Sequence, residues 1–232
     1  RLKEQLSKLE IETEAQILHR HETETGPRAE FDPLELDRYS SIQQFSRALA
    51  ETAGVSPAMI HRAVFESGLE RRCDRGEFGL DEYMNRLRSE WGLDMPGEDF
   101  IAARRASTRI RPNMLAGCEA LAESVSLGIF TNNGQWLQQH AERIVPELMP
   151  LFGTRFVSSG SLGLIKPDPD AFALCLQRLG FAAGSTLFVD DKAANVEGAR
   201  QAGLDALVFE DETQFFNELR TRGLDSGVSH AP

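Results

Sequence analysis

Two adjacent carboxylates, Asp190 and Asp191, follow the short apolar run at 187–189. Because neighbouring carboxylates repel each other when both are ionised, the pair favours a site that holds a cation. Mg²⁺ binds one or two carboxylates together with the phosphate oxygens of a substrate, so the pair indicates a Mg²⁺ site for a phosphorylated ligand. The alternative is that Asp191 caps the following helix and that Asp190 is solvated.

The elements that position this pair begin after Pro112, where apolar runs alternate with helical stretches. The runs at 125–130, 155–157, 186–190 and 206–209 have the length and composition of buried strands. Such alternation predicts a parallel sheet with right-handed crossovers, and ligands bind beyond the carboxyl ends of strands in such sheets. Thr131, Lys166 and Asp190 lie at or just past such ends, so we expect them to converge.

The stretch at 39–101 has apolar residues at helical spacing and no strand signal, which predicts a small helical bundle inserted before the α/β part. Ser56 and Pro57 have the residue types of a helix N-cap and first turn. Five arginines in this region could face a phosphorylated substrate, although such charges are more often ordinary solvated surface; they are Arg71, Arg72, Arg75, Arg104 and Arg105.

The N-terminal segment differs in character. The chain begins with Arg1 and not Met, as expected of a fragment or an imperfect gene model. Residues 2–20 carry a thin apolar stripe among Glu, Gln and Lys, which predicts a helix. Polar residues with Gly26-Pro27 then predict a linker. The same helix, read as an oligomerisation element, is the basis for expecting a homodimer.

Composition excludes several classes of protein. The 232 residues carry a formal net charge of −11, which argues against nucleic acid or an anionic membrane as a partner. No apolar run is long enough to span a bilayer, and the first residues show no secretory signal. Cys73, Cys118 and Cys175 are widely spaced, so we expect core thiols in a reducing compartment, the cytoplasm.

Three stretches in order, Leu127–Asn133 (LGIFTNN), Gly163–Pro169 (GLIKPDP) and Phe188–Gly203 (FVDD to AG), resemble the motifs of the haloacid dehalogenase-like hydrolase superfamily. The helical insert resembles that family's helical C1-type cap. The resemblance covers about residues 30–215 and is nearest to the branch of small sugar-phosphate and nucleotide phosphatases, which are typically Mg²⁺-dependent. It implies a Rossmann-like, doubly wound α/β core at 28–38 and 106–232, a cap at 39–105, and an N-terminal helical extension and linker at 1–27.

The resemblance also implies roles for single residues. Thr131 and the backbone N–H of Asn132 would bond phosphoryl oxygens, and Lys166 would neutralise charge on the phosphoryl group and the nucleophile. Asp190 would bind Mg²⁺ directly, with Asp191 supporting the metal. These roles suit phosphoryl transfer, which depends on positioning and charge neutralisation.

The first motif of the family requires a nucleophilic Asp at the end of a central apolar strand, usually with a second Asp two residues later. Asp32 is the candidate nucleophile and metal ligand, but Leu34 stands where the second Asp is expected, and residues 22–30 are too polar for a central strand. Asp37 is the fallback candidate. An active arrangement would place part of residues 28–37 between the Thr131 strand and the Asp190 strand.

The resemblance thus implies a Mg²⁺-dependent phosphatase that acts on a small phosphorylated metabolite, a sugar phosphate or nucleotide, through an aspartyl-phosphate intermediate. The departure of the first motif predicts weak activity or none for this chain as written. One alternative is a binding or regulatory protein whose first motif has decayed. Another is a 2-haloacid dehalogenase, which needs no metal; the carboxylate pair Asp190-Asp191 argues against it.

Overall fold

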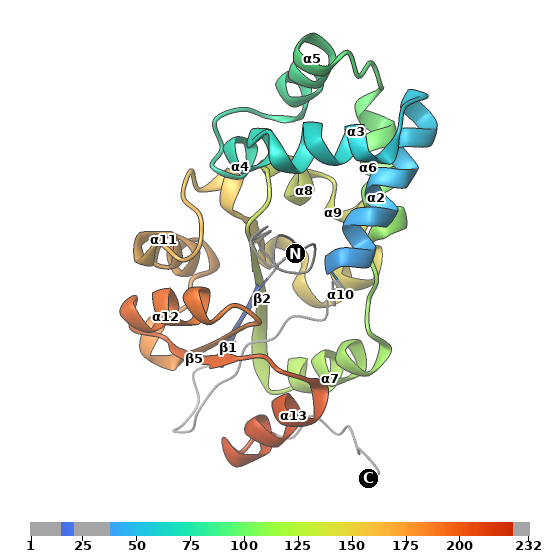
Figure 1. The fold of residues 1–232 in the computed structure, drawn as a ribbon. Helices are drawn as coiled ribbons and strands as arrows, with labels where there is room; N and C mark the ends of the chain where they lie inside the picture. The colour runs from blue at the N-terminus through green and yellow to red at the C-terminus, as the bar shows by residue number, and fades with distance from the viewer. Residues whose placement is uncertain (1–14, 21–37, 225–232) are drawn as a thin grey trace, which may run out of the picture.

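A five-stranded sheet with the order β3-β2-β1-β4-β5 forms the centre of the molecule in the computed structural model, which describes residues 15–20 and 38–224 (Figure 1). The pairs β2–β3 and β4–β5 are parallel. Helical connections join the strands within each pair, as expected of parallel neighbours. The strands are β1 Ala15–Arg20, β2 Val125–Thr131, β3 Phe156–Ser158, β4 Thr186–Asp190 and β5 Asp205–Val208.

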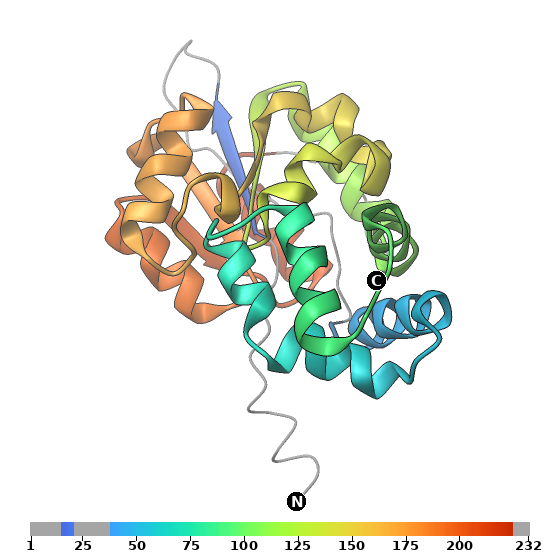
Figure 2. The same ribbon diagram turned by 90° about the horizontal axis from the view of Figure 1, so that it is seen from above.

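The central strand β1 runs antiparallel to both neighbours, and Figure 2 shows it between the two halves of the sheet. Ala15 lies opposite Phe130, and Gln16 lies opposite Val189, so the N-terminal end of β1 reaches the edge where β2 and β4 end.

The prediction of a helix over residues 2–20 is therefore wrong at residues 15–20, and the condition set for an active arrangement is not met. Residues 15–20 are a strand and not part of a helix, and they, not residues 28–37, fill the central slot. The physical reason is that backbone N–H and C=O groups of β2 and β4 face this slot and need partners, which a short, marginally stable helix cannot supply. The sheet is mixed instead of wholly parallel. Asp32 and Asp37 lie outside the described residues.

Helices cover both faces of the sheet, and alternate residues of each strand point to opposite faces. Phe130 and Phe188 pack against Phe172 on one face, whereas Leu127 and Leu187 belong to the cluster on the other. The predicted doubly wound α/β class is confirmed. The helices are α7 Pro112–Ala122, α8 Gln135–Gln139, α9 Ala141–Ile144, α10 Met149–Phe152, α11 Pro169–Leu179, α12 Ala193–Gln201 and α13 Glu212–Thr221, with 3₁₀ turns at Pro146–Leu148, Gly153–Arg155, Ser159–Ser161 and Ala183–Ser185.

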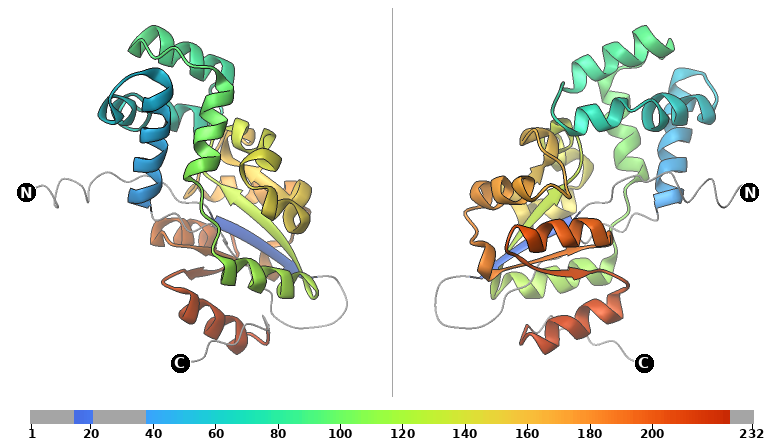
Figure 3. Two further views of the ribbon diagram at one scale, coloured as in Figure 1. Left: turned by 90° about the vertical axis from the view of Figure 1, so that its right-hand side faces the viewer. Right: turned by 60° about the vertical axis from the view of Figure 1, so that its left-hand side comes forward.

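The chain between β1 and β2 forms a helical cap, defined here as residues 38–107. Figure 3 shows the cap above the edge at which β2 ends. Ser56 caps α3 as predicted, since its side chain accepts the backbone N–H of Met59 at 3.3 Å. The cap consists of α2 Arg38–Ala53, α3 Pro57–His61, a π-helical turn Arg62–Glu66, α4 Leu69–Asp74, α5 Leu80–Trp91 and α6 Gly97–Ser107.

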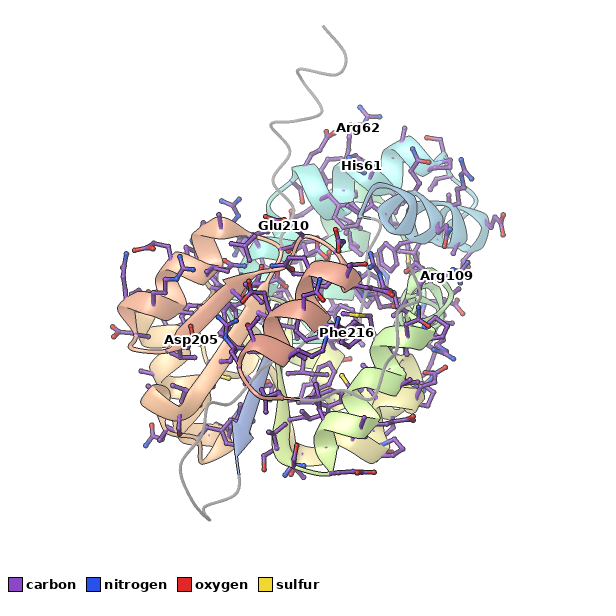
Figure 4. The ribbon with its side chains drawn as sticks, turned by 90° about the horizontal axis from the view of Figure 1, so that it is seen from below. His61, Arg62, Arg109, Asp205, Glu210 and Phe216 are labelled. Atoms are coloured by element: carbon purple, nitrogen blue, oxygen red, sulfur yellow. The ribbon has the colours of Figure 1, made fainter. Side chains whose placement is uncertain are left out.

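Apolar and polar contacts join the cap to the α/β part. The ring of Phe100 in α6 packs edge-on against Trp136 of α8, with ring centroids 5.1 Å apart. The Ser159 hydroxyl donates to the backbone carbonyl of Asp74 at 2.7 Å. In Figure 4, Arg109 marks the connection from α6 to α7. No helix in the described part of the chain is long and apolar enough to cross a membrane.

Candidate active site

The C-terminal edge of the sheet brings together side chains that are far apart in sequence. Lys166 follows β3 in the loop before α11, and Asp190 is the last residue of β4. The Lys166 Nζ lies 3.1 Å from the Asp190 Oδ2 and donates to the backbone carbonyl of Phe130 at 2.8 Å. Because Phe130 directly precedes Thr131 at the end of β2, the ammonium is held between the ends of β2 and β4.

Both members of the Lys166–Asp190 pair are buried, with side chains 0% exposed. The Asp190 Oδ2 also accepts the Asn195 amide at 2.9 Å, and Oδ1 accepts the Lys192 backbone N–H at 2.8 Å. Burial raises the pKa of the Asp190 carboxyl above its ordinary value, and Asp191 adds to the rise. The Lys166 charge and the two hydrogen bonds oppose it. The donors show how the fold stabilises a buried carboxylate that water cannot reach.

The fold fixes Lys166 through its backbone as well as its ammonium. The Asn132 side chain accepts the Lys166 N–H and donates to the Lys166 carbonyl, both at 2.9 Å. Behind this loop, a Cβ on Gly198 would lie 2.0 Å from the Pro167 carbonyl oxygen, so only glycine allows α12 to approach so closely. The Nζ also lies 5.3 Å from the ring centroid of Phe130, within cation–π range.

Thr131 belongs to a hydrogen-bonded chain that leads into the cap. The Asn133 amide donates to the Thr131 hydroxyl oxygen at 2.6 Å. Arg104 in α6 donates from its guanidinium to the Asn133 amide oxygen at 3.3 Å. Thr131 and Asn133 are 0% and 5% exposed, so this chain lies at the covered interface of cap and sheet edge.

The carboxylates at this edge fit a small metal site. Among the side chains that the structure describes, no group of three or more from His, Cys, Asp or Glu is placed to hold a metal ion. Asp190 and the exposed Asp191 nevertheless supply the one or two carboxylates that Mg²⁺ uses when water and phosphate oxygens complete its coordination. Asp190 and Asp191 are therefore the residues that would hold a Mg²⁺ ion at this edge.

The sequence predicted that Lys166 and Asp190 meet, but not the side chains that hold this edge and the cap together. Lys166 and Asp190 meet as expected, and the alternative of a solvated Asp190 is wrong because its side chain is buried. Lys192, not Asp191, is the N-cap residue of α12. The roles of Asn133 and Arg104 were not predicted, because the partners in each pairing are set by tertiary packing.

The comparisons with known proteins point to one family. A family model described as a hydrolase, haloacid dehalogenase-like hydrolase, matches residues 11–203. "Phosphatase MT3486" of Mycobacterium tuberculosis (strain CDC 1551 / Oshkosh) is 31% identical over 150 residues, 65% of this chain and 62% of that protein. "Sesquiterpene phosphatase astK" of Aspergillus oryzae (strain ATCC 42149 / RIB 40) is 30% identical over 166 residues, 68% of this chain and 80% of that protein.

A further relative is much longer than this chain. "Bifunctional epoxide hydrolase 2" of Rattus norvegicus is 26% identical over 149 residues, which are 60% of this chain and 26% of that protein. The chain thus spans about a quarter of the rat protein and less than two thirds of the mycobacterial phosphatase.

Solved structures show the same fold. A predicted HAD-like family hydrolase from Porphyromonas gingivalis superimposes with a TM-score of 0.63 at 20% identity, covering 82% of this chain and 91% of that one. A HAD family enzyme from Bacteroides thetaiotaomicron, in complex with magnesium and inorganic phosphate, gives 0.61 at 18% identity over 79% and 93%. A 2-haloacid dehalogenase from Pseudomonas syringae pv. Tomato DC3000 gives 0.57 at 20% identity over 77% and 83%.

Proposed function

This chain belongs to the haloacid dehalogenase-like hydrolases, and we propose that it is a Mg²⁺-dependent phosphatase acting on a small phosphorylated metabolite, a sugar phosphate or a nucleotide. The observation that carries the proposal is the buried Lys166–Asp190 pair at the end of β4. Its ammonium donates to the carbonyl of Phe130, the residue before Thr131. A buried ammonium bonded to the carbonyl that precedes Thr131 is suited, together with the Thr131 hydroxyl, to an anion with several oxygens, because both groups can donate to it.

The charge balance of the edge supports a metal requirement. Lys166 and Asp190 neutralise each other, so a phosphate dianion placed beside them would add two uncompensated negative charges in a buried site. A Mg²⁺ ion held by Asp190 and Asp191 would supply the charge neutralisation and polarise the phosphoryl oxygens.

The chain's own residues would divide the remaining work. Thr131 and the Asn132 backbone N–H would hold phosphoryl oxygens, and Lys166 would offset the charge that develops as the ester bond breaks. The proposed nucleophile is Asp32, although residues 15–20 and not 28–37 occupy the central slot. Its carboxylate would attack phosphorus and displace the alkoxide, which would take a proton from water. Water would then cleave the acyl phosphate, which releases inorganic phosphate and restores the carboxylate.

Hydrolysis of p-nitrophenyl phosphate by the full chain with Mg²⁺ tests the proposal. We expect turnover that EDTA abolishes, and its loss in Asp32→Asn while Asp37→Asn retains it. Equal rates for the wild type and Asp32→Asn would remove Asp32 from the mechanism. A wild type without turnover on any phosphate monoester would refute the phosphatase proposal.

A second candidate is a phosphate-binding or regulatory protein without turnover. The observation that favours it is the central slot, where the described strand presents Ala15 and Gln16, and no carboxylate, at the edge beside Phe130 and Val189. Mg²⁺-dependent phosphate binding without hydrolysis would support this candidate. Chloride release from a 2-haloacid that persists in EDTA would instead indicate dehalogenation.

A further inference from the structure

In the series of hydrogen bonds Arg104–Asn133–Thr131, the chemistry of the side chains fixes which group donates and which accepts. A guanidinium carries only donors, so the oxygen of the Asn133 amide must face Arg104, and its NH₂ must face Thr131. The Thr131 oxygen therefore accepts a hydrogen bond from Asn133. Within the described part of the chain this is the hydroxyl's only hydrogen bond, and no described residue takes its proton, which the hydroxyl can offer to a ligand.

Reversing the amide would reverse the chemistry of Thr131. If the Asn133 oxygen faced Thr131, the hydroxyl would donate its proton to that oxygen and present only lone pairs to a ligand. Lone pairs repel an anionic phosphoryl oxygen, whereas an O–H attracts it with a charge-assisted hydrogen bond. The orientation of one amide thus decides whether Thr131 favours or opposes a phosphate.

We propose that Arg104, a cap residue, acts through Asn133 as a positioning residue that sets Thr131 as a hydrogen-bond donor to the phosphoryl group. This inference rests on the proposed phosphatase function. It assigns the cap a second role besides covering the sheet edge at the ends of β2 and β4, which is to orient a phosphate-binding hydroxyl. The cap must be docked for Arg104 to reach Asn133, so the Thr131 hydroxyl is set for an anion only when α6 lies against the sheet edge.

The isosteric variant Asn133→Asp tests the donor and acceptor assignment in the Arg104–Asn133–Thr131 hydrogen bonds. An aspartate keeps the shape and strengthens the contact with Arg104, but it has no NH₂ and must accept the Thr131 proton. We expect its melting temperature to match or exceed that of the wild type, while the Kd for inorganic phosphate with Mg²⁺, measured by calorimetry, rises about 10- to 100-fold. If the Arg104–Asn133 contact were purely structural, Asn133→Asp would change phosphate binding only through its added charge, because the variant preserves that contact.

The added negative charge of Asn133→Asp would by itself weaken phosphate binding, and a double-mutant cycle separates the two effects. In Thr131→Val no hydroxyl is left to reorient, so adding Asn133→Asp should change the Kd by at most about 3-fold. An equal loss in both backgrounds would show a through-space charge effect and overturn the proposal.

Arg104→Met and Arg105→Met form a matched pair on the same helix. Arg104→Met removes the donor that faces the Asn133 amide oxygen, so we expect phosphate binding to weaken about 10-fold. Arg105 contacts Glu147 and the Ile144 carbonyl at the same interface but not Asn133, and its variant should bind phosphate as the wild type does. Equal losses in the two variants would point to cap attachment alone and overturn the proposal.

These binding measurements remain informative if hydrolysis fails. A wild type that binds phosphate without turnover refutes the phosphatase proposal, yet it still reports on the Arg104–Asn133–Thr131 chain. A wild type that turns over p-nitrophenyl phosphate but responds to none of the Asn133 and Arg104 substitutions refutes only the positioning role. A wild type that binds no phosphate, with or without Mg²⁺, overturns the positioning role because Thr131 then has no anion to receive its proton.

Discussion

Replacing Lys166 by methionine removes a buried charge with little change in side-chain length. The Asp190 carboxylate would keep the Lys192 N–H and the Asn195 amide as donors but lose its only buried cation among the described residues. The Phe130 carbonyl would lose the ammonium that donates to it at 2.8 Å. Breaking a buried ion pair by removing one partner costs about 3–5 kcal/mol, so we expect the free energy of unfolding to fall by that amount.

Equilibrium unfolding in urea measures this loss of stability. Two controls show whether it comes from a buried, coupled ion pair. The exposed pair Arg105–Glu147 should lose only about 0–1 kcal/mol in Arg105→Met, because water screens it. The double variant Lys166→Met/Asp190→Asn leaves no uncompensated charge, so it should be about 1–3 kcal/mol more stable than the sum of its single losses predicts. A loss below about 1 kcal/mol for Lys166→Met, or strict additivity in the cycle, would refute a tightly coupled buried pair.

Two other features give predictions that do not depend on activity. Gly198→Ala should lower stability in urea by about 1–3 kcal/mol because its Cβ would meet the Pro167 carbonyl oxygen at 2.0 Å. Gly184→Ala, with nothing within 4 Å, should change stability by less than about 0.5 kcal/mol, and equal effects would refute the close-approach argument. Burial raises the pKa of the Cys73 thiol from 9.0 to about 12, so iodoacetamide at neutral pH should label it only after unfolding, as read by mass spectrometry. Because the unfolded thiol ionises first, the stability from this group is complete below pH 9.0 and falls as pH rises toward 12. Labelling of native Cys73 would contradict this.

The strands β2 and β4 could be predicted because their signal is local. Each lies buried along its whole length, which demands an uninterrupted run of residues that can be buried, and polar residues mark the point where each run ends. The N-cap of α11 is local in the same way, since the Asp168 carboxylate accepts the Asp170 N–H at 3.0 Å. In all these cases the residues that decide the structure are neighbours in sequence.

The supports of the site could not be predicted in the same way. Asn132 holds the backbone of Lys166 from 34 positions away, and Arg104 reaches Asn133 from 29 positions away. An asparagine after a strand has equally good local uses in turns, so its residue type does not indicate a distant partner. Only the docking of the cap and the β3–α11 loop onto the sheet edge selects these pairs.

The direction of the central strand could not be predicted either, because amino-acid composition does not determine whether a strand pairs parallel or antiparallel. The slot between β2 and β4 requires an extended segment to pair their inner backbone groups, and an antiparallel strand satisfies them as well as a parallel one. The family's first motif requires a nucleophilic Asp at the end of a central strand, at the edge where β2 and β4 also end. In this chain β1 begins at that edge, with Ala15 opposite Phe130. Within the described residues, the edge therefore holds the groups proposed to bind a phosphate but no carboxylate from the central strand. Covalent catalysis then depends on an Asp outside those residues, so the comparison of the wild type with Asp32→Asn decides between turnover and binding alone.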